Sequence, residues 1–150
     1  MLPGAKSQPA EDVLCISWNK QVQHILASAF TQRCVVWDLR KNEPIIKLSD
    51  GSSRIRWKAL AWHPDVATQL CLASEEDQTP VIQLWDLRFA TSPLKTLEGH
   101  KRGVLSVAWC GQDPDLLVSC GKENRILVWN PNSNAPVTTG YFHHTLQVFN

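Results

Sequence analysis

The stretch VIQLWDLR at residues 81–88 has two counterparts in the chain, CVVWDLR at 34–40 and ILVWNP at 126–131. In each of the three, an apolar run rich in Val, Ile and Leu ends in a tryptophan, and an acid or an amide follows it. The tryptophans are spaced 48 and 44 residues apart: Trp37, Trp85 and Trp129. Similarity at a period of roughly 40 to 50 residues indicates that the chain is built from repeats.

A second series of tryptophans interlocks with the first. Each of its members ends an apolar run in Ser-Trp or Ala-Trp, and the spacings are 44 and 47 residues. The series consists of Trp18, Trp62 and Trp109. Because the two series alternate along the chain at the same period, they divide it into three units of similar layout.

Each unit contains four short apolar runs separated by turn residues, and no helical periodicity is visible. Short runs rich in β-branched and aromatic residues are typical of strands, and Pro, Asn and Asp between them are typical of turns. The sequence therefore predicts an all-β protein made of three four-stranded units. The expected strands are 13–18, 24–30, 34–39, 44–49, 58–63, 69–75, 81–87, 94–98, 104–109, 116–121, 126–130 and 135–140.

The inner runs of each unit are apolar on both faces. In a strand over 81–87, Ile82 and Leu84 point to one side and Val81 and Trp85 to the other. A strand of this kind is covered on both sides, which the stacking of one small sheet on the next provides.

We expect an N-terminal linker at 1–12 and a divergent C-terminal tail at 141–150. The units between them are expected at about 13–50, 58–98 and 104–140.

Composition argues against several classes of function. The chain has 150 residues, a formal net charge of +1 and 19% charged residues, so bulk charge gives no support for nucleic-acid binding. No apolar run is long enough to cross a bilayer, and the first twelve residues lack the apolar centre of a signal peptide. We expect a cytoplasmic protein without nucleic acid as a partner and without direct insertion into a membrane.

One basic cluster has the composition of a base-stacking site. It consists of Arg54, Arg56 and Lys58, with Trp57 among them. A solvated strand edge, with Ile55 and Trp57 directed inward and the charges outward, gives the same pattern. We favour the solvated edge.

Signatures of catalysis, cofactor binding and metal binding are absent from the sequence. It contains no GxSxG, GxGxxG, GxxxxGK[ST] or HExxH motif. Its five cysteines form no CxxC pair and lie within apolar runs, where a thiol usually serves as a small core residue. We therefore expect no enzyme activity, no cofactor, no metal and no small-molecule substrate.

These residues together resemble the WD40 repeats of β-propellers. WDLR at 37–40 and 85–88, WNP at 129–131 and Gly99-His100 match the motifs of that family. The segments ILAS, CLAS and LVSC, at 25–28, 71–74 and 117–120, occupy the place of its middle-strand motif. The resemblance implies a partial propeller of about three four-stranded blades, with structural positions at Trp37, Asp38, Trp85, Asp86, His100, Ser119, Glu123 and Trp129.

The family's hydrogen-bonded tetrad can be transferred to the third repeat alone. There it would consist of His100, Ser119, Glu123 and Trp129, with Glu in place of the usual Asp. In this family the tetrad is structural and not catalytic. The first two repeats lack the Gly-His pair, so we expect them to depend more on apolar packing.

A closer resemblance links the chain to the larger outer-cage subunits of the COPII vesicle coat. It extends through linkers such as KNEP at 41–44 and RFATSPL at 88–94, which WD40 repeats in general do not constrain. It implies a protein-interaction scaffold in ER-to-Golgi transport, peripheral at ER exit sites and coated vesicles. Its partners would be the other outer-cage subunit and further coat proteins. Because known propellers have roughly four to eight blades, three repeats suggest a fragment of a larger propeller.

An alternative function rests on Arg40 and Arg88. Each follows Trp-Asp by two residues, and WDxR resembles the motif by which some WD40 proteins dock on the adaptor of a cullin-RING ubiquitin ligase. An exposed guanidinium offers a planar fork that suits bidentate contacts to a carboxylate. Both arginines are therefore candidate partner contacts.

Overall fold

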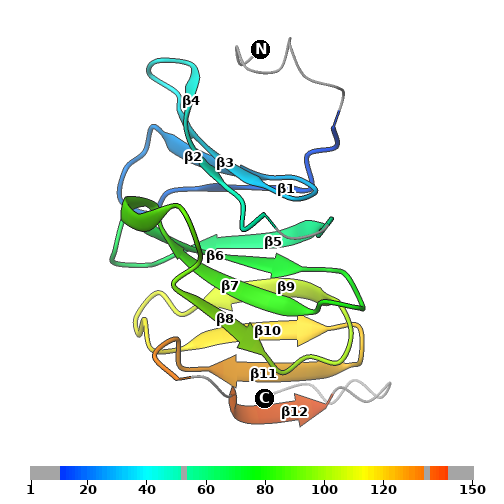
Figure 1. Cartoon of the computed structure of the whole chain (residues 1–150). Helices are drawn as coiled ribbons and strands as arrows, with labels where there is room; N and C mark the ends of the chain where they lie inside the picture. Colours follow the sequence, from blue (N-terminus) through cyan, green and yellow to red (C-terminus); the bar gives the residue numbers. More distant parts are fainter. Residues whose placement is uncertain (1–10, 52–53, 134–135, 142–150) are drawn as a thin grey trace.

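The computed structural model describes residues 11–51, 54–133 and 136–141. These residues form three antiparallel sheets of four strands, and within each sheet the strands follow one another in chain order. The expected all-β architecture of three four-stranded blades is confirmed (Figure 1).

The strand boundaries agree with the expected runs to within two residues. Blade 1 contains β1 (Cys15–Trp18), β2 (Ile25–Ala29), β3 (Cys34–Asp38) and β4 (Glu43–Leu48). Blade 2 contains β5 (Trp57–Trp62), β6 (Gln69–Ser74), β7 (Val81–Asp86) and β8 (Lys95–Glu98). Blade 3 contains β9 (Val104–Trp109), β10 (Leu117–Gly121), β11 (Arg125–Trp129) and β12 (Pro136–Tyr141). A short 3-10 helix, η2 (Leu87–Phe89), follows β7.

Tyr141, which we expected to open the C-terminal tail, is the last residue of β12. The rest of that tail and most of the N-terminal linker lie outside the described residues.

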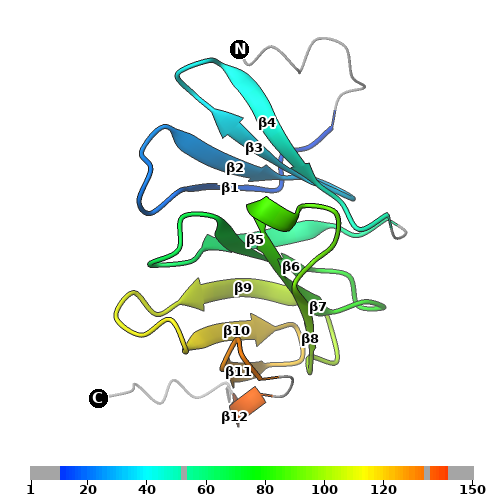
Figure 2. The same ribbon diagram turned by 60° about the vertical axis from the view of Figure 1, so that its left-hand side comes forward.

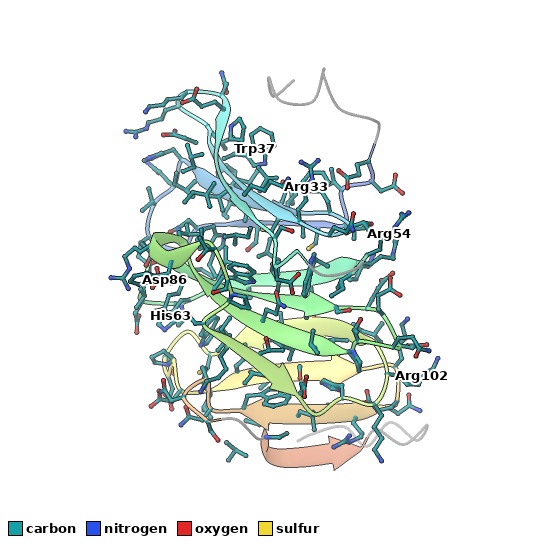
Figure 3. The ribbon with its side chains drawn as sticks, viewed as in Figure 1. Arg33, Trp37, Arg54, His63, Asp86 and Arg102 are labelled. Carbon is teal, nitrogen blue, oxygen red and sulfur yellow. The ribbon has the colours of Figure 1, made fainter. Side chains whose placement is uncertain are left out.

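The three blades are stacked, and their first strands neighbour one another: β1 contacts β5, and β5 contacts β9 (Figures 1 and 2). Strand order places the β1–β2 and β3–β4 turns, and their equivalents, at one end of the blades. The β2–β3 turn and the segments between blades lie at the other. Figure 3 shows this division: His63 and Asp86 lie at the first end, and Arg33, Arg54 and Arg102 at the second. We call these the WD end and the tetrad end.

Strand register explains the two tryptophan series. In every blade, a leucine on the second strand pairs with one tryptophan on the first strand and another on the third. Paired residues share a face of the sheet, so each blade presents tryptophan, leucine and tryptophan side by side. We call this the leading face; its sets are Trp18–Leu26–Trp37, Trp62–Leu70–Trp85 and Trp109–Leu117–Trp129.

The opposite face of each blade, the trailing face, carries smaller residues at the equivalent positions. Its sets are Ser17–Ala27–Val36, Ala61–Cys71–Leu84 and Ala108–Val118–Val128. Large residues on one face can therefore pack on small residues of the next, which gives the close packing that protein interiors require.

The core consists of two such contacts. One buries the leading face of blade 2 against the trailing face of blade 1, where Trp62 and Trp85 share a cluster with Ala27 and Val36. The other buries the leading face of blade 3 against the trailing face of blade 2, where Trp129 packs with the expected pair Ile82 and Leu84. Tryptophan spacing, read from the sequence as a repeat, thus records the position of the interfaces between blades.

Candidate functional site

The four tetrad positions in blade 3 are brought together by two strands, β10 and β11, and by two loops, the β8–β9 segment with His100 and the β10–β11 turn with Glu123. Trp129 on β11 donates its indole N–H to Ser119 Oγ on β10 at 2.8 Å. Ser119 Oγ lies 2.6 Å from His100 Nε2, and His100 Nδ1 lies 3.0 Å from Glu123 Oε1. The second Glu123 oxygen accepts the backbone N–H of Lys101. The resulting chain of hydrogen bonds joins the interior of β11 to the loops at the tetrad end.

Gly121 makes room for this arrangement. A Cβ atom on Gly121 would lie 1.8 Å from Glu123 Oε1 and 2.6 Å from His100 Nδ1. The glycine that ends β10 is therefore part of the site, although the sequence analysis gave it no role.

The hydrogen-bond pattern fixes the protonation of His100. The Glu123 carboxylate can only accept, so His100 carries a proton on Nδ1, and in the neutral histidine Nε2 is unprotonated and accepts the hydroxyl proton of Ser119. Neutral His100 then carries its proton on Nδ1 and donates it to Glu123. Burial, the largest effect, lowers the pKa of His100, although Glu123 acts in the opposite direction. Burial alone would raise the pKa of Glu123, but hydrogen bonds from Lys101 and His100 outweigh it and lower that pKa.

This arrangement has the residue types of a Ser-His-acid catalytic triad. A nucleophile needs access to its substrate, however, and both Ser119 and the His100 side chain are 1% exposed. The Ser119 oxygen is also engaged by Trp129. The geometry therefore supports a structural network that fixes the blade, and gives no route for a substrate to the serine.

Blade 1 keeps half of this network. Trp37 on β3 donates to Ser28 Oγ on β2 at 2.8 Å, and both residues are buried. Neither the Ser28 oxygen nor the Trp37 indole has a recorded histidine partner among the residues that the structure describes.

Blade 2 departs from the sequence alignment. The CLAS segment at 71–74 matches ILAS at 25–28 letter by letter, which would make Ser74 the equivalent of Ser28 in blade 2. In the structure, Leu70 pairs with Trp85 as Leu26 pairs with Trp37. The residue equivalent to Ser28, two positions after that leucine, is therefore Leu72. The alignment of the two strings is wrong by two residues. Buried Ser74 instead accepts the N–H of Glu76.

The acceptor for the Trp85 indole lies on the same strand as Trp85, whereas in blades 1 and 3 the acceptor lies on the second strand. Gln83 on β7 accepts the Trp85 N–H at 3.1 Å, and its own amide donates to Asp50 Oδ2 at 2.7 Å. In blades 1 and 3 the second strand carries the polar residue of this pair and the third strand the apolar one. In blade 2 the order is reversed, because Leu72 on β6 pairs with Gln83 on β7. The expectation that blade 2 depends more on apolar packing did not include this link to the segment that precedes β5.

Side-chain acceptors close the turns at the WD end. Asp38 Oδ1 accepts the N–H of Arg40, and Asp86 Oδ1 accepts the N–H of Arg88, each at 2.9 Å. Asn19, His63, Asp113 and Asn130 accept backbone N–H groups two residues ahead in the same way. An Asx turn of this kind explains why an acid or amide follows Trp37, Trp85 and Trp129.

The two candidate arginines are both exposed, but their guanidinium groups are engaged within their own turns. Arg88 makes a bidentate pair with Asp86, Nε to Oδ1 at 3.0 Å and Nη2 to Oδ2 at 2.7 Å. These bonds are the largest cause of the lowered pKa of Asp86. Arg40 lies 3.5 Å from Asp38. In Arg88 the fork that would grip a partner's carboxylate is already occupied, which weakens the basis of the ligase-adaptor alternative.

The surface beside Arg88 is apolar. Phe89 is 61% exposed, and Leu94, at the end of the same β7–β8 loop, is 51% exposed. The Arg88 guanidinium lies 5.8 Å from the centre of the Phe89 ring. A hollow of about 320 Å³ adjoins the loop, lined by residues that include Leu94, Lys95, His63 and Trp109. Linker similarity pointed to this loop as RFATSPL, but nothing in that segment indicated that its two large apolar side chains are exposed.

The basic cluster before β5 is part of the fold. Ile55 and Trp57 are buried, and Arg56 pairs with Glu75 at 2.7 Å.

Burial raises the pKa of the Cys15 thiol to about 11 and that of the Cys71 thiol to about 12, so the reactive thiolate form of each is disfavoured. The described part of the chain contains no helix able to span a bilayer.

Comparison with known proteins places this geometry among β-propellers. The family model for the WD domain, G-beta repeat, matches residues 91–130. The chain is 66% identical over 134 residues, 89% of its length, to protein transport protein Sec31A of Danio rerio. It is 46% identical over 129 residues, 85% of its length, to protein transport protein SEC31 of Dictyostelium discoideum.

A solved structure described as the outer coat vertex of COPII on membranes superposes with a TM-score of 0.84 at 35% identity. The match covers 94% of this chain and 38% of that one. The chain spans 11% of the length of the first relative and 10% of the second.

Proposed function

We propose that this chain, a partial WD40 β-propeller, acts as a protein-interaction scaffold of the COPII outer coat in ER-to-Golgi transport. The observation that carries the proposal is the 66% identity to Sec31A across 89% of the chain. The superposition on a chain of the COPII outer coat vertex supports it independently, because that match covers 94% of the chain. The role is one of binding and not of catalysis.

The proposed partners are the other outer-cage subunit and further coat proteins. The chain would be peripheral to the membrane, at ER exit sites and on coated vesicles. No nucleic acid, cofactor or small-molecule substrate has a place in this function. The eight structural WD40 positions would serve to hold the blades that present the partner surface.

We place the partner contact at the β7–β8 loop, on three observations. Phe89 and Leu94 are apolar and exposed, Arg88 lies beside them, and a hollow adjoins them. Aromatic residues and arginine are enriched at protein interfaces, where buried aromatic side chains act as anchors. Arg88 and Arg40 would contribute at the polar rim.

Binding of the purified outer-cage partner subunit to the immobilised chain tests this proposal. We expect the double variant Phe89→Ser, Leu94→Ser to weaken binding at least tenfold. Val137→Ser is the matched control, because Val137 is equally exposed but lies on β12 of blade 3. Circular dichroism establishes that each variant is folded.

Two outcomes would overturn parts of this assignment. An equal loss in the Val137→Ser control would mean that the β7–β8 loop is not the contact. Binding of a purified cullin-RING ligase adaptor that depends on Arg40 and Arg88, without any binding of the coat subunit, would reject the coat scaffold itself.

A further inference from the structure

Two places in the chain have a serine or threonine directly before a proline. They are Ser92-Pro93 in the β7–β8 loop and Thr79-Pro80 in the β6–β7 loop. Proline-directed protein kinases select such a pair, and some of them also select a lysine or arginine three residues after the phosphorylated residue. Lys95 has that place after Ser92, whereas Ile82 has it after Thr79. The sequence therefore favours Ser92 over Thr79 as a kinase substrate.

The structure distinguishes the two hydroxyl residues in the same direction. Ser92 is exposed, and within the described part of the chain no hydrogen bond holds it. Thr79 is exposed as well, but its N–H donates to Glu76 and its carbonyl accepts the N–H of Val81. The strand β7 begins directly after Pro80, and Ile82 is buried in it. A kinase could bind the residues after Thr79 only if an inner strand of blade 2 came apart.

The segment after Ser92 can open locally. A protein kinase binds its substrate as an extended segment, so the residues that follow the serine must leave the fold for a short time. Lys95 is the first residue of β8, which is the outer strand of blade 2 and pairs only with β7. Leu94 before it is 51% exposed, and Lys95 has no ion-pair partner among the described residues. The end of an outer strand that buries little apolar surface opens at a low cost in free energy.

We propose that Ser92 is a phosphorylation site for a proline-directed protein kinase, and that its phosphate weakens the partner contact of the β7–β8 loop. Ser92 lies in the loop between Phe89 and Leu94, the two exposed apolar residues of that contact. Burying these residues against a partner would bring the phosphate into an apolar interface, where loss of hydration makes a charge costly. The Arg88 guanidinium is already paired with Asp86. The second half of the inference rests on the function proposed above.

The phosphoryl donor is ATP with Mg²⁺, supplied with the kinase. The Ser92 hydroxyl oxygen forms a bond to the γ-phosphorus, and the bond between that phosphorus and the β–γ bridging oxygen breaks. ADP leaves with the bridging oxygen, and the catalytic aspartate of the kinase takes the hydroxyl proton. The product is a phosphoserine with a charge of roughly −1.5 to −2 at pH 7.

Treatment of the 150-residue chain with a purified cyclin-dependent kinase and Mg-ATP tests the modification. We expect intact-mass spectrometry to show one phosphoryl group per chain, and peptide mapping to place it on Ser92. Ser92→Ala should abolish the incorporation, whereas Thr79→Ala, the matched control at the other pair, should leave it unchanged. A wild-type chain that takes up no phosphoryl group would overturn the proposal. So would equal phosphorylation of Thr79, because the fold would then not select between the two pairs.

Binding of the purified outer-cage partner subunit, measured for each chain before and after kinase treatment, tests the consequence. We expect treatment to weaken binding of the wild type roughly tenfold or more and to leave binding of Ser92→Ala at its own untreated value. Equal or stronger binding by the phosphorylated wild type would overturn the regulation but not the proposed function. Failure of the untreated wild type to bind would reject the proposed function and the regulation together, while the mass spectra alone decide whether Ser92 is modified.

Discussion

Trp85 donates its indole N–H to Gln83, two residues earlier on the same strand, at 3.1 Å. In blades 1 and 3 the equivalent tryptophan donates to a serine on the neighbouring strand. The Gln83 side chain is longer than a serine side chain, and its amide also donates a hydrogen bond to Asp50, in the segment that leads into blade 2. Blade 2 therefore has its own polar connection from core to loop, built without a histidine.

The exchange between Leu72 and Gln83 predicts strong coupling. Gln83→Leu alone leaves the buried Trp85 N–H without its acceptor, which costs about 1–3 kcal/mol of unfolding free energy. Leu72→Ser alone removes buried apolar volume and places a hydroxyl in the core. In the double variant Leu72→Ser, Gln83→Leu, the new serine can accept from Trp85 as Ser28 and Ser119 do. We expect the double variant to lose less stability than the sum of the single variants, measured by urea unfolding. Additivity to within about 0.5 kcal/mol would contradict this.

Serine removal should cost more in blade 3 than in blade 1. Ser28→Ala leaves one buried group, the Trp37 N–H, without its partner, whereas Ser119→Ala leaves both the Trp129 N–H and His100 Nε2. At roughly 1–3 kcal/mol for each such group, Ser119→Ala is the more destabilising change. Urea unfolding monitored by tryptophan fluorescence gives the comparison, with exposed Ser106→Ala as the control. Equal losses at the two positions would mean that the histidine bond adds nothing.

Stability should fall as pH decreases below about 6.5. His100 and His63 both have a pKa lowered from 6.5, and burial is the largest cause for each. A histidine with a lowered folded pKa stabilises the protein fully above its unfolded pKa and loses that contribution as pH falls through the folded value. At His63 the reason is direct, because Nδ1 accepts the N–H groups of Asp65 and Val66 and cannot do so when protonated.

His100→Gln tests this dependence. The variant is expected to be less stable than wild type at pH 7.5, but to lose less stability between pH 7.5 and 5.5. Asp86 and Glu123, whose pKa values are lowered, lose their contribution to the free energy of unfolding only at pH values below this window. Urea midpoints at several pH values provide the measurement, and parallel profiles for the two proteins would exclude His100 as the source.

Close approach of blades 2 and 3 makes Gly103 sensitive to substitution. A Cβ atom at Gly103 would lie 1.9 Å from the backbone oxygen of Glu75, so Gly103→Ala must push the blades apart. We expect a loss of roughly 1–3 kcal/mol or more, as for overpacking in a core. Gly111→Ala is the matched control: nothing lies within 4 Å of its Cβ position, and reduced freedom of the unfolded chain favours the alanine. Thermal unfolding should separate the two variants in opposite directions.

Much of the fold followed from the tryptophan spacing. The tryptophans of the two series lie at the last or the second-last residue of their strands and at a fixed place in the register. Their spacing therefore predicted both the strand positions and the number of blades. The packing of Ile82 and Leu84 to one side of β7 and Trp85 to the other also followed from alternation.

What the sequence concealed depends on pairing between strands. CLAS and ILAS look equivalent as strings, but Leu70 and not Leu72 pairs with Trp85, so Ser74 falls outside the serine position. The acceptor Gln83 lies on the third strand of its blade and not on the second, and no motif marks it there. Phe89 and Leu94 were also concealed, because the exposure of a loop residue depends on which blade stands beside it.

The difference between the leading and trailing faces gives the repeat a polarity. Each unit of about 45 residues has a leading face that packs on the preceding blade and a trailing face that the next blade covers, so duplication of one unit adds a blade that fits both neighbours. A substitution on a trailing face, in contrast, must be matched by a change on the leading face of the next blade. Adding a blade by duplication therefore requires fewer changes than altering one interface between two blades.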